Sequence, residues 1–322
     1  MTHSLGVVLS QAPGRDPRCV LDGARAADEL NYPELWLGEM AMFDAFALAT
    51  AAAHATSRIA LTVGPLAVDI RTPVGIAMGV GSVAALTGRR VGVALGTSSP
   101  VVVERWHGRV RECGTARLAD SVAALRLLLA GEKVDFDGAV LSTHGFRLLV
   151  PPEAPSVTIA AFGERAVRVA ARHADRMVLN LVTPATVRRL RGMLEAAAPA
   201  GRTPRLAVWV SAALNPTPEA LTHLRRAKVG YLAAPGYGEM FTEAGFGDLV
   251  AFAGGRPRPA EVLARIPDEL PAAVGAIGDV DTVRARVSEY FDAGADEVVL
   301  NPATEGDPGG RATLALVRDL AP

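Results

Sequence analysis

Residues 157–181 read VTIAAFGERAVRVAARHADRMVLNL. An apolar run at 157–161 is followed by a glycine turn, a stretch with helical periodicity at 164–173, and a second apolar run at 177–181. Short continuous apolar runs are typical of strands that are buried on both faces, as in parallel sheets. The stretch therefore predicts a strand–helix–strand unit, the repeating element of α/β folds.

The same pattern extends over nearly the whole chain. Further apolar runs, which bring the total to eight, lie at 5–9, 34–38, 59–63, 91–95, 206–212 and 297–301. Helical periodicity is found between them at 18–30, 43–56, 118–130, 185–197, 280–293 and 314–320. Eight β/α units in this order favour a (β/α)8 barrel over a doubly wound sheet, so the predicted fold class is α/β with a TIM barrel.

Two insertions interrupt this order, and no linker divides the chain, so residues 1–322 are expected to form one barrel domain. Residues 134–149 contain short β-like pieces and glycine turns, which predict a small hairpin. Residues 230–271 are long and rich in glycine and proline. Long excursions of this kind are usually functional, so we expect a lid or a dimer element.

Composition excludes several classes of protein. Lys and Arg number 33 against 34 Asp and Glu, and no basic run stands out, so a nucleic-acid partner is not expected. The longest uncharged stretch, 72–88, is shorter than the about 20 apolar residues of a membrane span. The first residues do not resemble a secretory signal. Two cysteines without CxxC spacing indicate a cytoplasmic protein.

Histidine spacing argues against metal chemistry. No two of the six histidines form an HxH or HxxxH pair, so we expect no metal site. His107 lies just past the run at 91–95, where it could transfer protons, although a purely structural histidine is the alternative. No GxSxG motif is present, so a hydrolase triad has no local support.

Catalytic groups of such barrels lie at the carboxyl ends of the strands. The segment AFGER, 161–165, leads directly into a predicted helix, whose first amides would attract a phosphate. GTSS at 96–99 offers hydroxyls at a neighbouring strand end, although turns in any barrel carry such residues. The GxGxxA match at 79–84 instead predicts a buried helix, because no strand precedes it.

Taken in order, several segments resemble the bacterial luciferase-like superfamily, and most of all its coenzyme F420-dependent oxidoreductases. They are LWLGEM, TVGPLAVDIRTP, ALTGRRVGVALGTSS, the 159–184 stretch from IAAFGER to LVTP, and GDVDTVRARVSEYFDAGADEVVLNP. The resemblance implies a TIM barrel with a deazaflavin or flavin across its carboxyl-terminal mouth. It also implies a bulge with a cis peptide in the third strand and a homodimer.

The resemblance carries over to particular residues. Glu39 would lie near the reactive edge of the cofactor ring and, with His107, is a catalytic candidate. The implied cofactor-binding residues are Val63, Gly64, Pro65, Gly96, Thr97, Ser98, Ala161, Phe162, Gly163, Glu164 and Asn180. One departure stands out, because well-known deazaflavin members carry Asp or Asp-His where this chain has Glu39 and Met40.

Three hypotheses follow. The first is an F420-dependent oxidoreductase that transfers a hydride between C5 of the deazaflavin and a small organic substrate, with Glu39 or His107 as acid or base. The second is an FMN-dependent two-component monooxygenase on the same barrel. The third is a non-catalytic barrel that binds a ligand, which the missing Asp-His pair supports.

Overall fold

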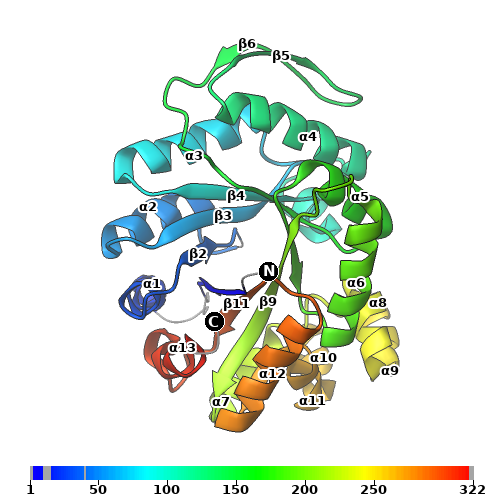
Figure 1. Ribbon diagram of the computed structural model, residues 1–322. Coiled ribbons are helices and arrows are strands. Elements are labelled where there is room, and N and C mark those ends of the chain that lie inside the picture. Colours follow the sequence, from blue (N-terminus) through cyan, green and yellow to red (C-terminus); the bar gives the residue numbers. More distant parts are fainter. Residues whose placement is uncertain (1–2, 10–15, 40, 319–322) are drawn as a thin grey trace. The chain divides into compact units, whose positions relative to one another are not determined.

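The computed structural model describes residues 3–9, 16–39 and 41–318. Met40 of the Glu39-Met40 pair lies outside these ranges, as do the last two residues of the helix expected at 314–320. Strands and helices alternate along the chain (Figure 1).

The strands are β1 (Ser4–Val8), β2 (Glu34–Leu37), β3 (Ala60–Ala67), β4 (Val91–Gly96), β5 (Lys133–Asp137), β6 (Ser142–Arg147), β7 (Val157–Ala160), β8 (Arg176–Asn180), β9 (Arg205–Leu214), β10 (Gly275–Gly278) and β11 (Glu297–Pro302). The α-helices are α1 (Val20–Glu29), α2 (Ala45–Ala55), α3 (Pro73–Thr87), α4 (Gly114–Leu129), α5 (Glu164–His173), α6 (Pro184–Ala197), α7 (Pro218–Arg226), α8 (Tyr237–Phe241), α9 (Gly247–Gly254), α10 (Pro259–Arg265), α11 (Glu269–Ala273), α12 (Val280–Asp292) and α13 (Arg311–Arg318). Short 3-10 helices are η1 (Pro17–Cys19) and η4 (Pro308–Gly310), and π-helices are η2 (Val101–Trp106) and η3 (Thr242–Phe246).

The eight strands predicted from apolar runs make the barrel. Their order is β9-β11-β1-β2-β3-β4-β7-β8, and β8 pairs with β9. β10 adds to β9, and β5 and β6 form a separate antiparallel pair. The fold is therefore the α/β class (β/α)8 barrel that the sequence predicts. β10 has only four residues, GAIG, which is too short for a distinct apolar run.

Contacts divide the chain into two compact units. The first unit comprises residues 1–32, 179–192 and 206–322, and the second unit comprises residues 33–178 and 193–205. The second unit contains β2, β3, β4 and β7 with helices α2 to α5, while the first contains β1, β9, β10 and β11.

A buried ion pair ties the amino-terminal ends of the second unit's strands together. Arg176, at the start of β8, donates from Nη1 to Oε2 of Glu34 on β2 over 2.6 Å. Its Nη2 also donates to Thr62 Oγ1 on β3, and its Nε donates to Thr158 Oγ1 on β7, each over 3.2 Å. The guanidinium carbon lies 4.2 Å from the centroid of the Trp36 ring. We call these five residues the base cluster.

Helix α3 carries the GxGxxA match and packs as the sequence predicts. A Cβ on Gly79 would lie 2.5 Å from the Phe46 ring, and one on Gly81 would lie 2.6 Å from the Val150 carbonyl oxygen. The small residues therefore serve close packing between segments of the second unit.

The insertion predicted at 134–149 is a hairpin of β5 and β6, which lies over α4 (Figure 1). Asp120 of α4 accepts a hydrogen bond from the Val140 amide at 2.7 Å, which fixes the hairpin turn on this helix.

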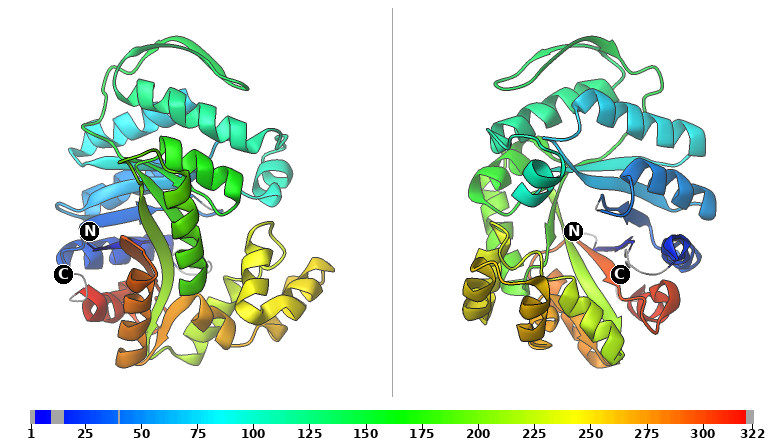
Figure 2. Two further views of the ribbon diagram at one scale, coloured as in Figure 1. Left: turned by 45° about the vertical axis from the view of Figure 1, so that its right-hand side comes forward. Right: turned by 180° about the vertical axis from the view of Figure 1, so that it is seen from behind.

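The insertion at 230–271 is largely helical and belongs to the first unit. Its short helices form a separate group, drawn in yellow in Figure 2. They enclose a small apolar cluster of buried side chains, namely Leu181, Leu232, Phe241, Ala253, Val262, Ile266, Leu270 and Val274. Whether the segment acts as a lid or a dimer element stays a prediction.

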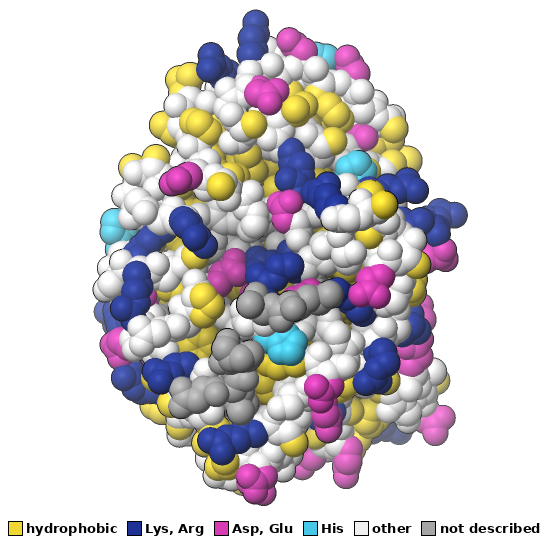
Figure 3. Space-filling view, in the orientation of Figure 1, with side chains coloured by type: hydrophobic (Ala, Val, Ile, Leu, Met, Phe, Trp, Pro, Cys, Tyr) yellow, Lys and Arg dark blue, Asp and Glu magenta, His cyan; other side chains and the backbone are white. Residues whose placement is uncertain are grey.

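Basic and acidic side chains are interspersed on the face shown in Figure 3. Within the described ranges, no helix combines the length and the apolar character needed to cross a membrane.

Candidate active site

The carboxyl-terminal end of β3 is irregular where the sequence predicts a bulge. The register between β3 and β4 shifts between Val63 and Leu66, and the Gly64–Pro65 peptide is cis. Gly64 has φ +110°, and a Cβ there would lie 2.4 Å from the Ala94 carbonyl oxygen. Only glycine fits this backbone conformation and this close approach.

Neighbouring strand ends lie beside the bulge. A Cβ on Gly96, the last residue of β4, would contact Cβ of Ala160 at 3.5 Å and Cβ of Pro65 at 3.7 Å. Ser98 follows with φ +55°, a left-handed conformation that is uncommon for residues other than glycine. The second unit thus brings together the predicted residues of β3, β4 and β7 on a surface of small side chains.

The turn after β7 leads into α5, as predicted. Gly163 is the N-cap of α5, and a Cβ added to it would meet no described atom within 4 Å. The first amides of α5 are therefore accessible for an anion. Glu164 is exposed and forms an ion pair with Arg168 one turn later, so the two charges offset each other.

A cluster that the sequence analysis missed lies at the same strand ends. Asp69, two residues past β3, is buried, with 1% of its side chain exposed. Arg117, in the first turn of α4, places Nε 3.0 Å from Asp69 Oδ1. Arg111 donates from Nη2 to Thr97 Oγ1 over 3.4 Å. We call Asp69, Arg111 and Arg117 the mouth cluster.

The mouth cluster is incompletely bonded. Both Asp69 oxygens, Nε of Arg111 and Nε of Arg117 are buried and have no hydrogen-bond partner within the described part of the chain. Burial raises the pKa of Asp69, while Arg117 and Arg111 act in the opposite direction. Buried polar groups are normally hydrogen-bonded, and exceptions often mark places where a ligand or water binds.

Helix α4 adds to the positive character of this site. Its N-cap, Cys113, makes no side-chain hydrogen bond to the helix, so the first amides of the helix lack that partner. A Cβ on Gly114 would lie 3.5 Å from the Thr97 side chain. Arg111 and an uncapped helix start thus lie beside Thr97, and together with Arg117 they form a donor set that suits a phosphate group.

Glu39 is engaged in the fold. Arg71 Nε donates to Glu39 Oε2 over 2.9 Å, and Arg71 Nη2 contacts both Glu39 Oε1 and Asp44 Oδ2. Asp44 in turn caps α2 by accepting from the Phe46 and Ala47 amides. Interaction with Glu39 and Asp44 raises the pKa of Arg71 far above its ordinary value. Glu39 therefore shares the Arg71 guanidinium with the N-cap of α2.

His107 is exposed at the end of the π-helix η2. Its imidazole makes no hydrogen bond or ion pair within residues 41–318, the range in which it lies. Trp106 beside it is 54% exposed. The loop after β4 thus presents an imidazole and an indole to solvent.

Asn180 belongs to the first unit. It is the last residue of β8, and its Nδ2 donates to the Tyr237 hydroxyl over 3.5 Å. Burial raises the pKa of Tyr237. Leu181 follows with φ +57° and packs into the apolar cluster of the 230–271 segment.

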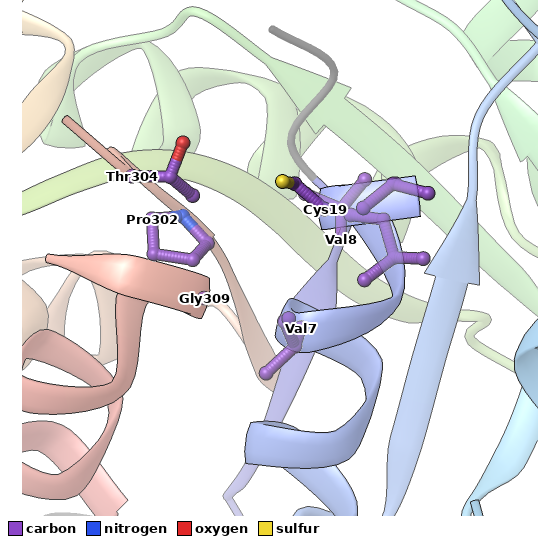
Figure 4. Close-up of a pocket in the computed structure, with 9 residues that line it drawn as sticks. Val7, Val8, Cys19, Pro302, Thr304 and Gly309 are labelled. Atoms are coloured by element: carbon purple, nitrogen blue, oxygen red, sulfur yellow. The ribbon is translucent and has the colours of Figure 1, made fainter. Parts of the chain in front are cut away.

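A small hollow in the first unit differs from the mouth cluster. It lies at the ends of β1 and β11, and Figure 4 shows Val7, Val8, Cys19, Pro302, Thr304 and Gly309 around it. Among the residues that the structure describes, no charged side chain lines this hollow. It therefore lacks the charged donors that an anionic cofactor favours.

A family model described as luciferase-like monooxygenase matches residues 3–297. The chain belongs to this family. The resemblance seen in the sequence is confirmed, and the fold agrees with solved structures of the family's type. With the F420-dependent tetrahydromethanopterin reductase of Methanopyrus kandleri the TM-score is 0.81 at 17% identity, over 100% of this chain and 99% of that one.

Two further structures show the same fold with different cofactors. An F420-dependent secondary alcohol dehydrogenase, in complex with an F420–acetone adduct, has a TM-score of 0.79 at 16% identity, over 99% of this chain and 98% of that one. The oxygenating constituent of 3,6-diketocamphane monooxygenase from Pseudomonas putida, in complex with FMN, has a TM-score of 0.69 at 18% identity. The match covers 99% of this chain and 98% of that one. At these identities the likeness shows the fold alone.

Proposed function

We propose that this protein is an oxidoreductase that binds a deazaflavin or flavin at the strand ends of its second unit. The observation that carries the proposal is the β3 bulge at Gly64–Pro65, packed beside Gly96 and Ala160 and followed by the mouth cluster. The small residues leave room for a flat ring, and the arginines supply donors for its phosphate.

The residues present fit both the ring and the phosphate of such a cofactor. Val63, Gly64 and Pro65 would back the ring, with Gly96, Ser98 and Ala161 beside it. Thr97, Arg111 and Arg117 would bind the phosphate, assisted by the open amides of α4 and of α5 at Phe162, Gly163 and Glu164. When bound, coenzyme F420 supplies hydride transfer at C5, and FMN in its place supports oxygen chemistry.

The chain's own residues orient the reactants and handle protons. Glu39, the other catalytic candidate, accepts a hydrogen bond from Arg71, and we propose that it lies at the edge of the site. His107, which is exposed at the end of η2, is the residue that we assign to proton transfer with a small organic substrate. We further propose that Asn180 contacts the cofactor.

The deciding experiment is a fluorescence titration of the purified protein with F420, FMN and riboflavin. Saturable binding of F420, with weaker binding of FMN, supports the F420-dependent oxidoreductase. The opposite preference supports the FMN-dependent monooxygenase, and oxygen uptake with reduced FMN then tests it. Binding of none of the three refutes both and favours a non-catalytic barrel.

The proposal includes two further points that the resemblance implies. We expect a homodimer, and the molar mass measured by light scattering during size-exclusion chromatography checks this. We also expect the segment 230–271 to exclude water during turnover. Shortening its exposed turn at 254–257 should then increase side reactions with water more than it alters cofactor affinity.

A further inference from the structure

The mouth cluster has an unusual composition for an anion site, because a buried carboxylate lies among its arginines. Asp69 contacts Arg117 directly, and both Arg117 and Arg111 interact with its charge. One aspartate and two arginines leave the cluster with a net charge of +1 rather than +2.

This charge sum matters because the ion pair with Arg117 leaves both Asp69 oxygens without a hydrogen bond within the described residues. The Asp69 side chain is 1% exposed. An ionised Asp69 therefore repels a second negative charge placed on the arginines, with little screening by water. Repulsive elements of this kind are a common source of ligand specificity.

Phosphate groups differ in charge in the relevant way. A phosphomonoester carries between one and a half and two negative charges at neutral pH, because its second pKa is about 6. A phosphodiester has lost that second ionisable oxygen and carries one. FMN is a phosphomonoester, whereas the phosphate of coenzyme F420 is a diester.

We propose that Asp69 is a specificity-determining residue, which shifts the preference of the mouth cluster away from a doubly charged phosphomonoester and towards a singly charged phosphodiester. The inference rests on the proposed function for the identity of the ligand. It goes beyond that function because it assigns the choice between the two cofactor classes to one buried carboxylate of this chain.

The test compares the native chain with Asp69→Asn at pH 8, where a phosphomonoester is doubly charged. The ligands are FMN, riboflavin and F420, titrated by fluorescence. We expect Asp69→Asn to tighten FMN binding by about tenfold relative to F420, because like charges in contact are strongly unfavourable. Riboflavin, which lacks the phosphate, should bind both proteins equally.

A matched control removes one carboxylate elsewhere in the second unit. Glu153→Gln lies at an exposed position and should leave the FMN-to-F420 ratio unchanged. A second variant, Arg111→Gln, reduces the cluster to zero net charge and should weaken FMN binding more than F420 binding, because the doubly charged phosphate loses more attraction. It keeps the test open if Asp69→Asn fails to fold.

Simple anions separate failure of this inference from failure of the proposed function. Thermal shifts with inorganic phosphate and with dimethyl phosphate at pH 8 report charge preference without any cofactor. Relative to dimethyl phosphate, inorganic phosphate should stabilise Asp69→Asn more than it stabilises the native chain. If the anion preference does not change in Asp69→Asn, or if FMN and F420 affinities change equally, the inference is wrong, whatever the cofactor titration shows.

Discussion

The two ends of the second unit's strands use the same kinds of residue in opposite ways. In the base cluster, Arg176 bonds to Glu34, Thr62 and Thr158 and lies over Trp36, so its donors are used. In the mouth cluster, Arg111, Arg117 and Asp69 keep buried polar atoms without a hydrogen bond within the described residues. A satisfied buried network stabilises a fold, whereas an unsatisfied one is available to a ligand.

The largest expected effect breaks the base cluster. Arg176→Met removes the guanidinium that bonds to Glu34 and leaves a carboxylate that is 18% exposed without this cation. Loss of one member of a buried pair costs about 3–5 kcal/mol of unfolding free energy. Urea denaturation measures this loss, and Arg168→Gln, in an exposed pair, should cost less than about 1 kcal/mol. An equal loss of unfolding free energy in Arg176→Met and Arg168→Gln would contradict the distinction between the buried and the exposed ion pair.

The next effect concerns ligand affinity at the mouth cluster. Arg117→Gln should weaken F420 or FMN binding by about tenfold to a hundredfold, because it removes a charge-assisted hydrogen bond. Asp69, whose side chain is 1% exposed, loses its contacting cation in this variant, so the unfolding free energy should fall as well. Paired titration and denaturation curves check this, and unchanged affinity would remove Arg117 from the site.

A smaller effect is the pH dependence of stability at Asp69. Burial raises the pKa of this carboxyl above its unfolded value of 3.8, so the folded state holds the proton more tightly. The stability of the native chain relative to Asp69→Asn should therefore fall as pH rises from about 4 through the folded pKa. Denaturation midpoints from pH 4 to 7 measure this difference. If the stability of the native chain relative to Asp69→Asn rises with pH, the pKa of Asp69 is lowered rather than raised.

The smallest effect on stability is expected at His107. His107→Gln alters an exposed side chain, so the unfolding free energy should change by less than about 0.5 kcal/mol. If the imidazole transfers a proton, kcat should fall about a hundredfold while cofactor affinity is unchanged. Arg105→Gln, two residues earlier and also exposed, is the control and should leave kcat unchanged.

The sequence predicts the framework well and the mouth cluster poorly. Apolar runs define the eight barrel strands because each is buried on both faces, and helix α5 begins and ends at the predicted residues. The bulge at Gly64–Pro65 also lies where the resemblance implies it. These features depend on local composition or on a motif within a few residues.

The mouth cluster depends on contacts across 42 to 48 residues of sequence, from Asp69 to Arg111 and Arg117. Asp69 lies six residues past the predicted run at 59–63, and Arg111 lies sixteen past the run at 91–95, farther than the strand-end residues considered from the sequence. Arg111 and Arg117, close together in the sequence, were the available signal. That they meet a buried aspartate follows only from the register of β3 and β4 and from the start of α4.

The small apolar cluster of the 230–271 segment has an evolutionary consequence. Because its members, such as Leu232, Phe241 and Val262, are buried mainly against one another, mutations there change the segment before they disturb the barrel strands. Segments with their own cores also open as local cooperative units. Evolution can therefore alter this segment with little effect on the global unfolding of the barrel strands.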